Sequence, residues 1–340
     1  MEEKGKKGRM DYTLLLIVVL LVVIGLVILY STSAYNGQVK FHDSFYYLKK
    51  QAFATVLGIV LMLFVAGMDY HIWQRLAVFG YLAAVALSVA VMLFGREING
   101  SKRWLALGPF SFQPSEFAKV ALILFLADLV TKNVKTIGKM WTLCRIMFWI
   151  LPIVGLVGAS NLSTAIIILG IGVILIFVAS PKYAQFALMG IAGACFMGIF
   201  LALESYRLER LAIWRNPEKY EKGYQTLQGL YAIGSGGVFG VGIGNSVQKL
   251  GFVPEAQNDM IFSIICEELG LAGAGIIVFL FLLLIWRFFL IASGSRDLFG
   301  ALIATGAMAH MMIQVILNIA VVTNTIPNTG ITLPFISYGG

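Results

Sequence analysis

The chain has 340 residues, of which 59% are hydrophobic and 12% are charged, and its formal net charge at pH 7 is +8. A soluble domain carries roughly 25% charged residues, so this composition excludes a soluble globular protein and indicates a polytopic membrane protein with many spans in one bundle. The basic excess has two explanations: cytoplasmic loops that obey the positive-inside rule, or attraction to anionic lipid or phosphate. Its scatter between spans argues against nucleic-acid binding.

The N-terminus is basic and is followed by a long apolar stretch. Lys4, Lys6, Lys7 and Arg9 precede the apolar residues of Tyr12–Tyr30. A secretory leader has a basic start too, but its apolar core is only about 7–15 residues long. The alternative of cleavage within residues 31–34 stays open, and the sequence favours an uncleaved first span with a cytoplasmic N-terminus.

Hydropathy predicts nine spans in all. They cover about Tyr12–Tyr30, Gln51–Met68, Leu76–Phe94, Pro114–Val130, Cys144–Val157, Leu162–Ala179, Tyr183–Leu203, Met260–Leu290 and Leu298–Val322. With the N-terminus inside, the inner loops hold the cations that the positive-inside rule expects. The outer loops are basic as well; long loops escape the rule, but cations on the outer face would also suit an anionic substrate there.

Cysteine and histidine give no sign of a metal or disulfide framework. Three cysteines lie in or beside apolar segments, and three histidines are far apart: Cys144, Cys195, Cys266, His42, His71 and His310. Such cysteines behave as small hydrophobic residues, and the spacing predicts no zinc site.

The longest stretch that is not simply apolar is Gly223–Gly270. It contains a dense glycine run with no nucleotide-binding pattern, which we expect to pack against the membrane surface. Polar residues so close to a bilayer are costly unless they line a cavity or face water. Asp259 stands where the polar loop becomes an apolar helix, so partial desolvation should raise its pKa. The residues alone do not decide whether Asp259 is catalytic or caps the eighth span.

Two further sets of charged residues stand out. Glu116 and Lys119 are three residues apart at the start of the fourth span, so they share a helix face and can pair. The pair could bind substrate or be a structural ion pair near the helix end. Glu267 and Glu268 enter the apolar eighth span, where we expect them to form hydrogen bonds across the bundle. The C-terminal residues from Asn324 onward predict a non-helical loop, because Pro and Gly recur in them.

Four segments together resemble a known family. They are 99–119 (NGSKRWLALGPFSFQPSEFAK), 223–249 (GYQTLQGLYAIGSGGVFGVGIGNSVQK), 252–270 (FVPEAQNDMIFSIICEELG) and 333–340 (LPFISYGG). They are similar to the signature segments of the SEDS (shape, elongation, division and sporulation) proteins, which are peptidoglycan polymerases. The residues around 246–256 are more similar to the FtsW/SpoVE-like members than to the RodA-like members.

The resemblance implies an all-α polytopic membrane protein with a bundle of about ten helices, nine of them in this sequence. The tenth helix of the family follows the motif that ends this chain, so we expect that span to be missing here. The whole chain, 1–340, would be one integral membrane domain. Its functional extracellular loops would be about 95–115, 204–259 (between spans seven and eight) and 323–340.

The resemblance also implies an activity: a glycosyltransferase that polymerises lipid II into glycan strands, with a polyprenyl diphosphate as the leaving group. The essential aspartate of the family maps onto Asp259, which would be the catalytic carboxylate. The residues expected to bind substrate are Arg103, Lys119, Lys249, Gln248, Ser246 and Glu116. A transient divalent cation, Mg²⁺ or Mn²⁺, could bridge Asp259 and the diphosphate, and no organic cofactor is expected.

Partners and location follow from the resemblance alone. The expected partners are lipid II, a class B penicillin-binding protein with transpeptidase activity, and other membrane proteins of the division machinery. The expected location is the bacterial plasma membrane at the division septum. Two alternatives remain: a lipid II flippase, which predicts a polar path to the cytoplasm, and a non-enzymatic scaffold, which predicts that loop residues tolerate change.

Overall fold

A computed structural model describes residues 10–98, 101–107, 110–187, 190, 193 and 211–339. Its long helices are α1 (Tyr12–Phe41), α2 (Tyr46–Ala66), α3 (His71–Phe94), α4 (Pro114–Asn133), α5 (Met140–Ser160), α6 (Leu162–Ala179), α10 (Ile261–Ser293) and α11 (Leu298–Val322). The shorter elements are the 3₁₀ turns η1 (Pro217–Lys219) and η2 (Glu221–Gly223), and α9 (Tyr224–Ser235). The predicted all-α membrane bundle is confirmed, and eight of the nine predicted spans correspond to described helices.

Seven of the described helices are long and apolar enough to cross a membrane. The eighth, α4, is 20 residues long and carries charged residues near both ends. Its apolar side chains are buried against α3, α6 and α11, so α4 lies inside the bundle and not at its lipid-facing surface. The predicted span Tyr183–Leu203 lies mostly outside the described residues.

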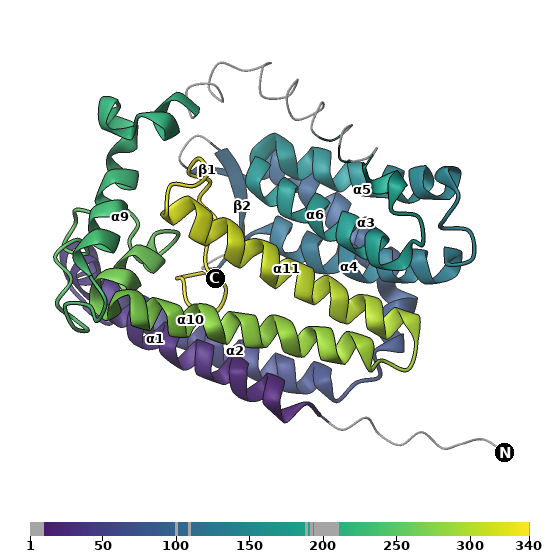
Figure 1. The fold of residues 1–340 in the computed structure, drawn as a ribbon, viewed down its shortest axis with the longest axis horizontal. Helices are drawn as coiled ribbons and strands as arrows, with labels where there is room; N and C mark the ends of the chain where they lie inside the picture. The colour runs from purple at the N-terminus through teal and green to yellow at the C-terminus, as the bar shows by residue number, and fades with distance from the viewer. Residues whose placement is uncertain are drawn as a thin grey trace.

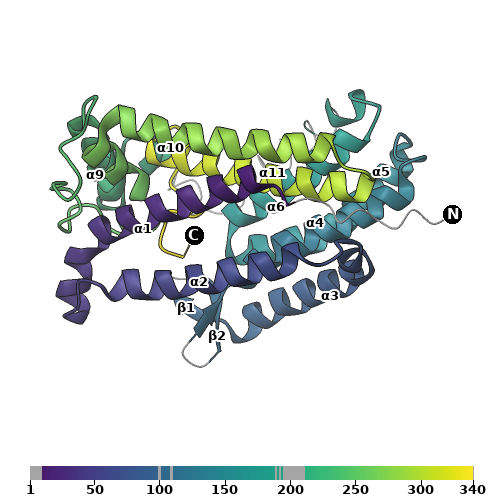
Figure 2. The same cartoon turned by 90° about the horizontal axis from the view of Figure 1, so that it is seen from below.

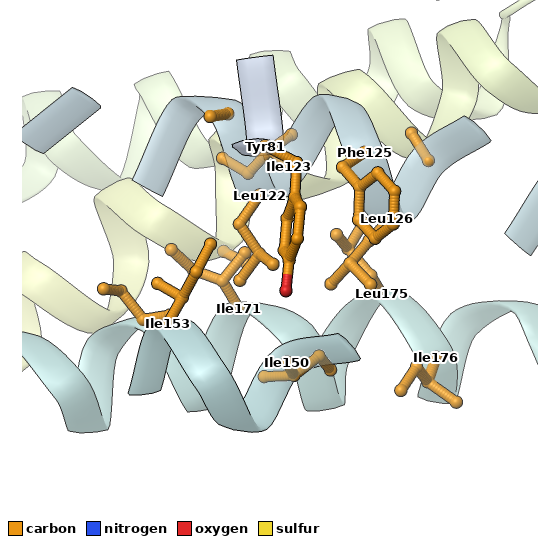
Figure 3. Close-up of a cluster of buried hydrophobic side chains, with 14 of the residues drawn as sticks. Tyr81, Leu122, Ile123, Phe125, Leu126, Ile150, Ile153, Ile171, Leu175 and Ile176 are labelled. Carbon is orange, nitrogen blue, oxygen red and sulfur yellow. The ribbon is translucent and has the colours of Figure 1, made fainter. Parts of the chain in front are cut away.

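The long helices run along the long axis of the molecule, with α11 between two groups (Figures 1 and 2). On one side of α11, helices α3 to α6 enclose an apolar core that includes Tyr81, Leu122 and Ile150 (Figure 3). On the other side, α1 and α10 form a second core with the loop before α10 and the C-terminal residues around Ile336. Helix α11 contributes to both cores, which makes it the central helix of the bundle.

The two ends of the bundle differ in charge and in structure. At one end, called the basic end here, α3, α11 and α1 begin and α4 and α10 finish. Arg287 of α10 pairs there with Asp11 (3.0 Å), and Arg75 and Lys132 line one polar hollow. The opposite end, called the loop end, carries α9, Asp259 and a small sheet between α3 and α4. Arg75, Lys132 and Arg287 thus lie at the same end of the bundle, although they come from three separate parts of the chain.

The small sheet was not predicted. Strands β1 (Arg96–Ile98), β2 (Ser101–Leu107) and β3 (Phe110–Phe112) pair antiparallel in the order β1-β2-β3, where the sequence indicated a loop over 95–115. The antiparallel pairings of β1 with β2 and of β2 with β3 satisfy backbone N–H and carbonyl groups that would otherwise be unpaired near the membrane. The sheet leads directly into the first turn of α4, which begins with Pro114.

Helix α10 is broken at Gly270, whose backbone is left-handed (φ 68°). The glycine run lies against the break. N–H groups of Val241 and Gly242 donate to the carbonyls of Glu267 and Glu268, both at 3.0 Å. A Cβ on Gly240 would come within 2.2 Å of the Glu268 carbonyl oxygen, so only glycine allows this approach. The glycine run thus packs against the backbone of α10, a contact that the sequence did not predict, and its packing on the membrane surface stays a prediction.

Candidate functional site

Asp259 lies in the loop directly before α10, and its side chain is 9% exposed. The N-cap position of α10 is taken by Met260, which makes no side-chain capping bond, so Asp259 does not cap this helix. Its carboxylate accepts a long hydrogen bond (3.5 Å) from Nε2 of Gln225 on α9. Burial raises the pKa of Asp259 to about 6, while hydrogen bonds from the backbone N–H groups of Asp259 and Met260 act in the opposite direction.

The C-terminal segment, Thr329–Leu333, runs beside Asp259 without regular structure, as the sequence predicted. Nδ2 of Asn318 donates both to the carbonyl of Asp259 (2.9 Å) and to that of Ile331 (2.7 Å). A Cβ on Gly330 would lie 3.8 Å from Oδ2 of Asp259, so the carboxylate faces this segment. Two stretches far apart in the sequence therefore form one wall around the carboxylate.

Glu116 and Lys119 form the ion pair that their spacing predicts. Nζ of Lys119 lies 2.8 Å from Oε2 of Glu116 and donates to Oε1 of Gln314 on α11 (3.1 Å). The Lys119 side chain is 1% exposed, whereas that of Glu116 is 51% exposed. The pair thus extends from the interior of the bundle towards its surface, with the cation at the buried end.

One face of α11 contacts both this pair and the backbone of Asp259. His310, Gln314 and Asn318 are spaced four residues apart, and Gln314 accepts from Lys119, contacts His310 Nε2 at 2.8 Å and donates to the carbonyl of Thr332 (3.2 Å). Gln314 and Asn318 are about one turn, or 6 Å of rise, apart. Because Gln314 and Asn318 bind the consecutive carbonyls of Thr332 and Ile331, the C-terminal segment lies against the α11 residues that hold Lys119 and the backbone of Asp259. Sequence reasoning missed these three residues, although polar residues every fourth position in an apolar helix were a visible signal.

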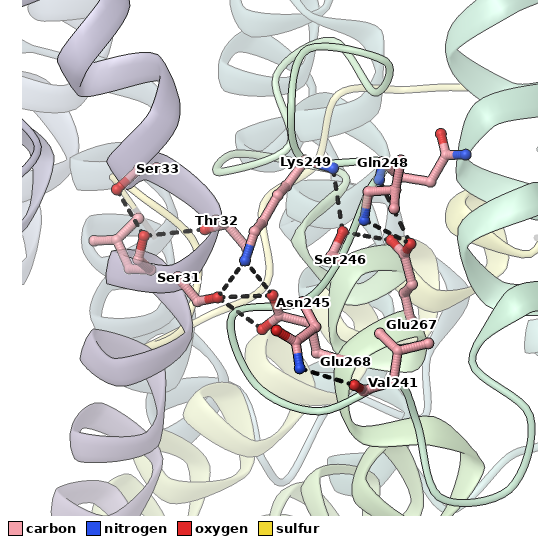
Figure 4. Close-up of polar contacts among 12 residues, drawn as sticks. Ser31, Thr32, Ser33, Val241, Asn245, Ser246, Gln248, Lys249, Glu267 and Glu268 are labelled. Carbon is pink, nitrogen blue, oxygen red and sulfur yellow. Dashed lines mark hydrogen bonds and ion pairs between the residues drawn. The ribbon is translucent and has the colours of Figure 1, made fainter.

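Lys249 is already paired inside the protein (Figure 4). Its Nζ lies 2.6 Å from Oε1 of Glu268 and 3.0 Å from Oγ of Ser31 on α1, and Ser31 also donates to Glu268. All three side chains are buried. The network ties the loop that carries Lys249 to both α1 and α10.

Ser246 and Gln248 belong to an adjacent network around Glu267 (Figure 4). Oγ of Ser246 donates to the Glu267 carboxylate, and the backbone N–H groups of Val247 and Gln248 point at its other oxygen, at 3.0 and 3.5 Å. The expectation of hydrogen bonds across the bundle is confirmed for Glu268, which binds Ser31 of α1, whereas Glu267 binds the loop before its own helix. Ser246, Lys249 and the backbone of Gln248 are thus bound to the two glutamates in this structure. The substrate-binding roles of Ser246, Gln248 and Lys249 stay predictions.

Arg103 of β2 reaches the turn between α5 and α6. Its Nε donates to the carbonyl of Ser160 (3.1 Å), and its side chain lines a small hollow with Ser115 at the start of α4. Arg103 therefore lies near the first turn of the helix that carries Glu116 and Lys119.

The candidate site offers few ligands for a metal ion. Among the described residues, no group of three or more His, Cys, Asp or Glu side chains could hold one. Asp259 supplies a single carboxylate, whereas Mg²⁺ takes six oxygen ligands and binds proteins through one or two carboxylates plus substrate phosphates and water. The predicted divalent cation would depend on oxygens that the substrate brings.

Comparison with known proteins identifies the family. The model of the FtsW, RodA and SpoVE family, described as "Cell cycle protein", matches residues 12–340. The chain belongs to this family. "Stage V sporulation protein E" of Bacillus subtilis (strain 168) is 40% identical over 348 residues, covering 98% of this chain and 93% of that protein. "Probable peptidoglycan glycosyltransferase FtsW" of Trichlorobacter lovleyi is 35% identical over 336 residues, covering 97% and 88%.

Solved structures of the FtsW/RodA/SpoVE family share the fold. A chain from a structure described as "Structural coordination of polymerization and crosslinking by a peptidoglycan synthase complex" matches with a TM-score of 0.83 and 29% identity, covering 97% of this chain and 92% of that chain. The rod shape determining protein RodA of Thermus thermophilus matches with a TM-score of 0.71 and 27% identity, covering 97% and 90%. The predicted family is thereby confirmed.

Proposed function

We propose that this chain is a peptidoglycan glycosyltransferase that polymerises lipid II, with Asp259 as the catalytic carboxylate. Relatives named peptidoglycan glycosyltransferase FtsW support the reaction class. The observation that carries the assignment of Asp259 is its burial in the wall between the loop before α10 and the C-terminal segment, where its pKa is raised to about 6. A carboxylate in such a place can accept a proton near neutral pH.

The proposed reaction joins two lipid-linked sugars. A hydroxyl of the acceptor sugar attacks the anomeric carbon of the donor, the bond to the diphosphate breaks, and Asp259 takes the hydroxyl proton. Negative charge develops on the leaving diphosphate, which a fixed cation stabilises best where water is excluded. Lys119 is a buried cation bound by Gln314, on the α11 face that also holds the backbone of Asp259, and Arg103 lies near the start of its helix. We assign these two to the diphosphate side, with Glu116 holding Lys119 in place.

Lys249, Ser246 and Gln248 have a second proposed role beside direct substrate contact. Their hydrogen bonds to Glu267 and Glu268 fix the shape of the loop that leads to Asp259. A direct contact of Lys249 with the diphosphate would require the ion pair with Glu268 to open. The divalent cation also belongs to the proposal, with Asp259 as its one ligand from the protein.

The orientation, location and partners are proposed on the same basis. The N-terminus and the basic end would face the cytoplasm, and the loop end would face the outer side of the plasma membrane, at the division septum. The solved relative whose description joins polymerization to crosslinking supports a transpeptidase partner, which we take to be a class B penicillin-binding protein, together with other membrane proteins of cell division.

The flippase alternative needs a polar path through the bundle, which the described residues of α4 oppose. Between Lys119 near the loop end and Asp128 near the basic end, about 14 Å of helix rise, the side chains are apolar, and those of residues 121–123 and 125–127 are buried (Figure 3). Asp128 is instead bound by Lys132 and Gln74 at the basic end. The polar residues of α4 thus form two separate sets, which favours polymerisation at one end.

The test is lipid II polymerisation by the protein with its transpeptidase partner and a divalent cation. We expect Asp259→Asn to abolish glycan strands while expression and partner binding stay intact. Asp43→Asn is the matched control, because Asp43 is a half-buried aspartate of the same end that binds Lys49 and the Phe45 N–H, away from the candidate site. Full polymer from Asp259→Asn would refute the catalytic assignment. If the wild-type protein moved lipid II across liposome membranes and made no polymer, the flippase hypothesis would replace the polymerase hypothesis.

A further inference from the structure

The stretch Tyr224–Gln248 contains no charged residue, although it belongs to a loop region. It comprises α9 and the glycine run, here called the glycine loop, Gly237–Gly244. The apolar side chains of this loop point outward: Phe239 is 84% exposed, Val238 58% and Ile243 56%. In water, so many exposed apolar side chains on a short segment would mark an interaction surface.

The glycine loop has a fixed position relative to α10. N–H groups of Leu271 and Ala272 donate to the carbonyls of Gly237 and Val238, at 2.9 and 3.0 Å. On the other side of the break, the loop donates back to the carbonyls of residues 267 and 268. The exposed side chains of the loop are therefore held at the level of Gly270.

The level of Gly270 can be placed relative to the bilayer. Arg287, paired with Asp11, is the first charged residue of α10 after the break and marks the basic-end boundary. Arg287 stands 17 positions after Gly270, which is about 26 Å of helix rise, against a hydrocarbon core of about 30 Å. Gly270 and the glycine loop thus lie close to the opposite boundary, where acyl chains meet head groups.

The exposed face of the loop continues a lipid-facing surface. Leu271, which donates to the loop, is 71% exposed, and Ile276 and Phe279 further along α10 are 60% and 57% exposed. Helix α9 lies across the end of the bundle and not along it (Figure 1), which is how an interfacial helix lies in a membrane. Its Tyr231 is also exposed (58%), and tyrosine is enriched at membrane interfaces.

We propose that the glycine loop is a membrane anchor that inserts Val238, Phe239 and Ile243 into the lipid leaflet at the loop end. The partner is the lipid itself, at the boundary between acyl chains and head groups, because the patch is apolar, uncharged and continuous with the lipid-facing side of α10. The anchor sets the distance between the acyl chains and the loop that leads to Asp259.

The test is spin labelling of the full chain in vesicles of phosphatidylethanolamine and phosphatidylglycerol, with the native cysteines replaced by alanine. The label is placed at Phe239→Cys and, as a second site in the same loop, at Ile243→Cys. Collisions are measured with molecular oxygen, which concentrates in lipid, and with a water-soluble nickel chelate. Ile276→Cys on α10 is the lipid control, and Lys222→Cys before α9 is the water control.

We expect both loop sites to follow Ile276→Cys, with oxygen collisions exceeding nickel collisions. A label at either folded loop variant that meets nickel as readily as Lys222→Cys does would overturn the proposal, because the loop would then stand in water. Protection from both reagents would overturn it as well, since the surface would then be covered by protein, in a second copy or a partner.

Discussion

Replacing Asp259 by Asn should stabilise the folded protein near neutral pH while it removes catalysis. Burial raises the pKa of Asp259 from 3.8 to about 6, so the folded state resists ionisation that the unfolded chain accepts. The stability associated with the protonated side chain is fully present below about pH 4 and is lost as the pH rises through about 6. At about 1.4 kcal/mol per pKa unit, the loss amounts to about 3 kcal/mol at neutral pH. Asn is neutral at every pH and avoids it.

The assay is thermal unfolding of wild type and variant in the same detergent at about pH 4 and about pH 7.5. With the unfolding entropy per residue of globular proteins, about 3 kcal/mol corresponds to a rise in Tm of about 4 °C at the higher pH, and no rise is expected at the lower pH. Asp43→Asn is the control: hydrogen bonds from Lys49 and the Phe45 N–H lower the pKa of Asp43, so its replacement should not stabilise. An equal rise in Tm at both pH values, or none at neutral pH, would refute the reasoning.

Three further predictions concern the same end of the molecule. The polymerisation rate should fall as the pH drops through about 6, since Asp259 must be ionised to accept a proton; a rate profile that is flat from about pH 5 to 8 contradicts this role. Gly270→Ala should lower the Tm by an amount equivalent to about 1–3 kcal/mol, because its Cβ would lie 2.3 Å from a backbone nitrogen of the glycine loop. Gly275→Ala is the control: its Cβ would meet nothing within 4 Å, so the Tm should not fall. Lys249→Met should destabilise the folded protein by about 3–5 kcal/mol in thermal unfolding, because it leaves Glu268 buried without its cation. The double variant with Glu268→Gln should regain most of that stability. If the losses of the two single variants simply add in the double variant, the two residues are not coupled.

Hydropathy was sufficient to find the eight long helices that the structure describes, because about 20 apolar residues are needed to cross a bilayer. It ended α1 at Tyr30, yet the helix continues to Phe41. The extra turns begin with polar residues 31–33, of which Ser31 is bound by Lys249 and Glu268, more than two hundred residues away. The break at Gly270 was invisible for a similar reason. Its sequence is compatible with a continuous helix. The backbone N–H and carbonyl groups that the break leaves unpaired within α10 form hydrogen bonds with the glycine loop, which is a tertiary partner.

The candidate site was partly predictable. Asp259 and the Glu116–Lys119 pair could be found, since charged residues at helix ends in an apolar chain are conspicuous and a three-residue spacing fixes a shared face. The partners of Asp259 could not be derived, because a single sequence does not say which face of α11 meets which loop. For Lys249 the same limit applies: its acidic partner is visible in the sequence, but only packing shows that the two are paired.

The double hydrogen bond of Asn318 has a consequence for how the protein is made. It joins the carbonyl of Asp259 to that of Ile331, so the wall around the carboxylate needs residues synthesised 72 positions later. During membrane insertion, α10 and its preceding loop emerge first, and α11 and the C-terminal segment follow. Until they arrive, Asp259 lacks the neighbours that bury it and raise its pKa. The nascent chain therefore carries an incomplete candidate site until residues up to Ile331 have been added.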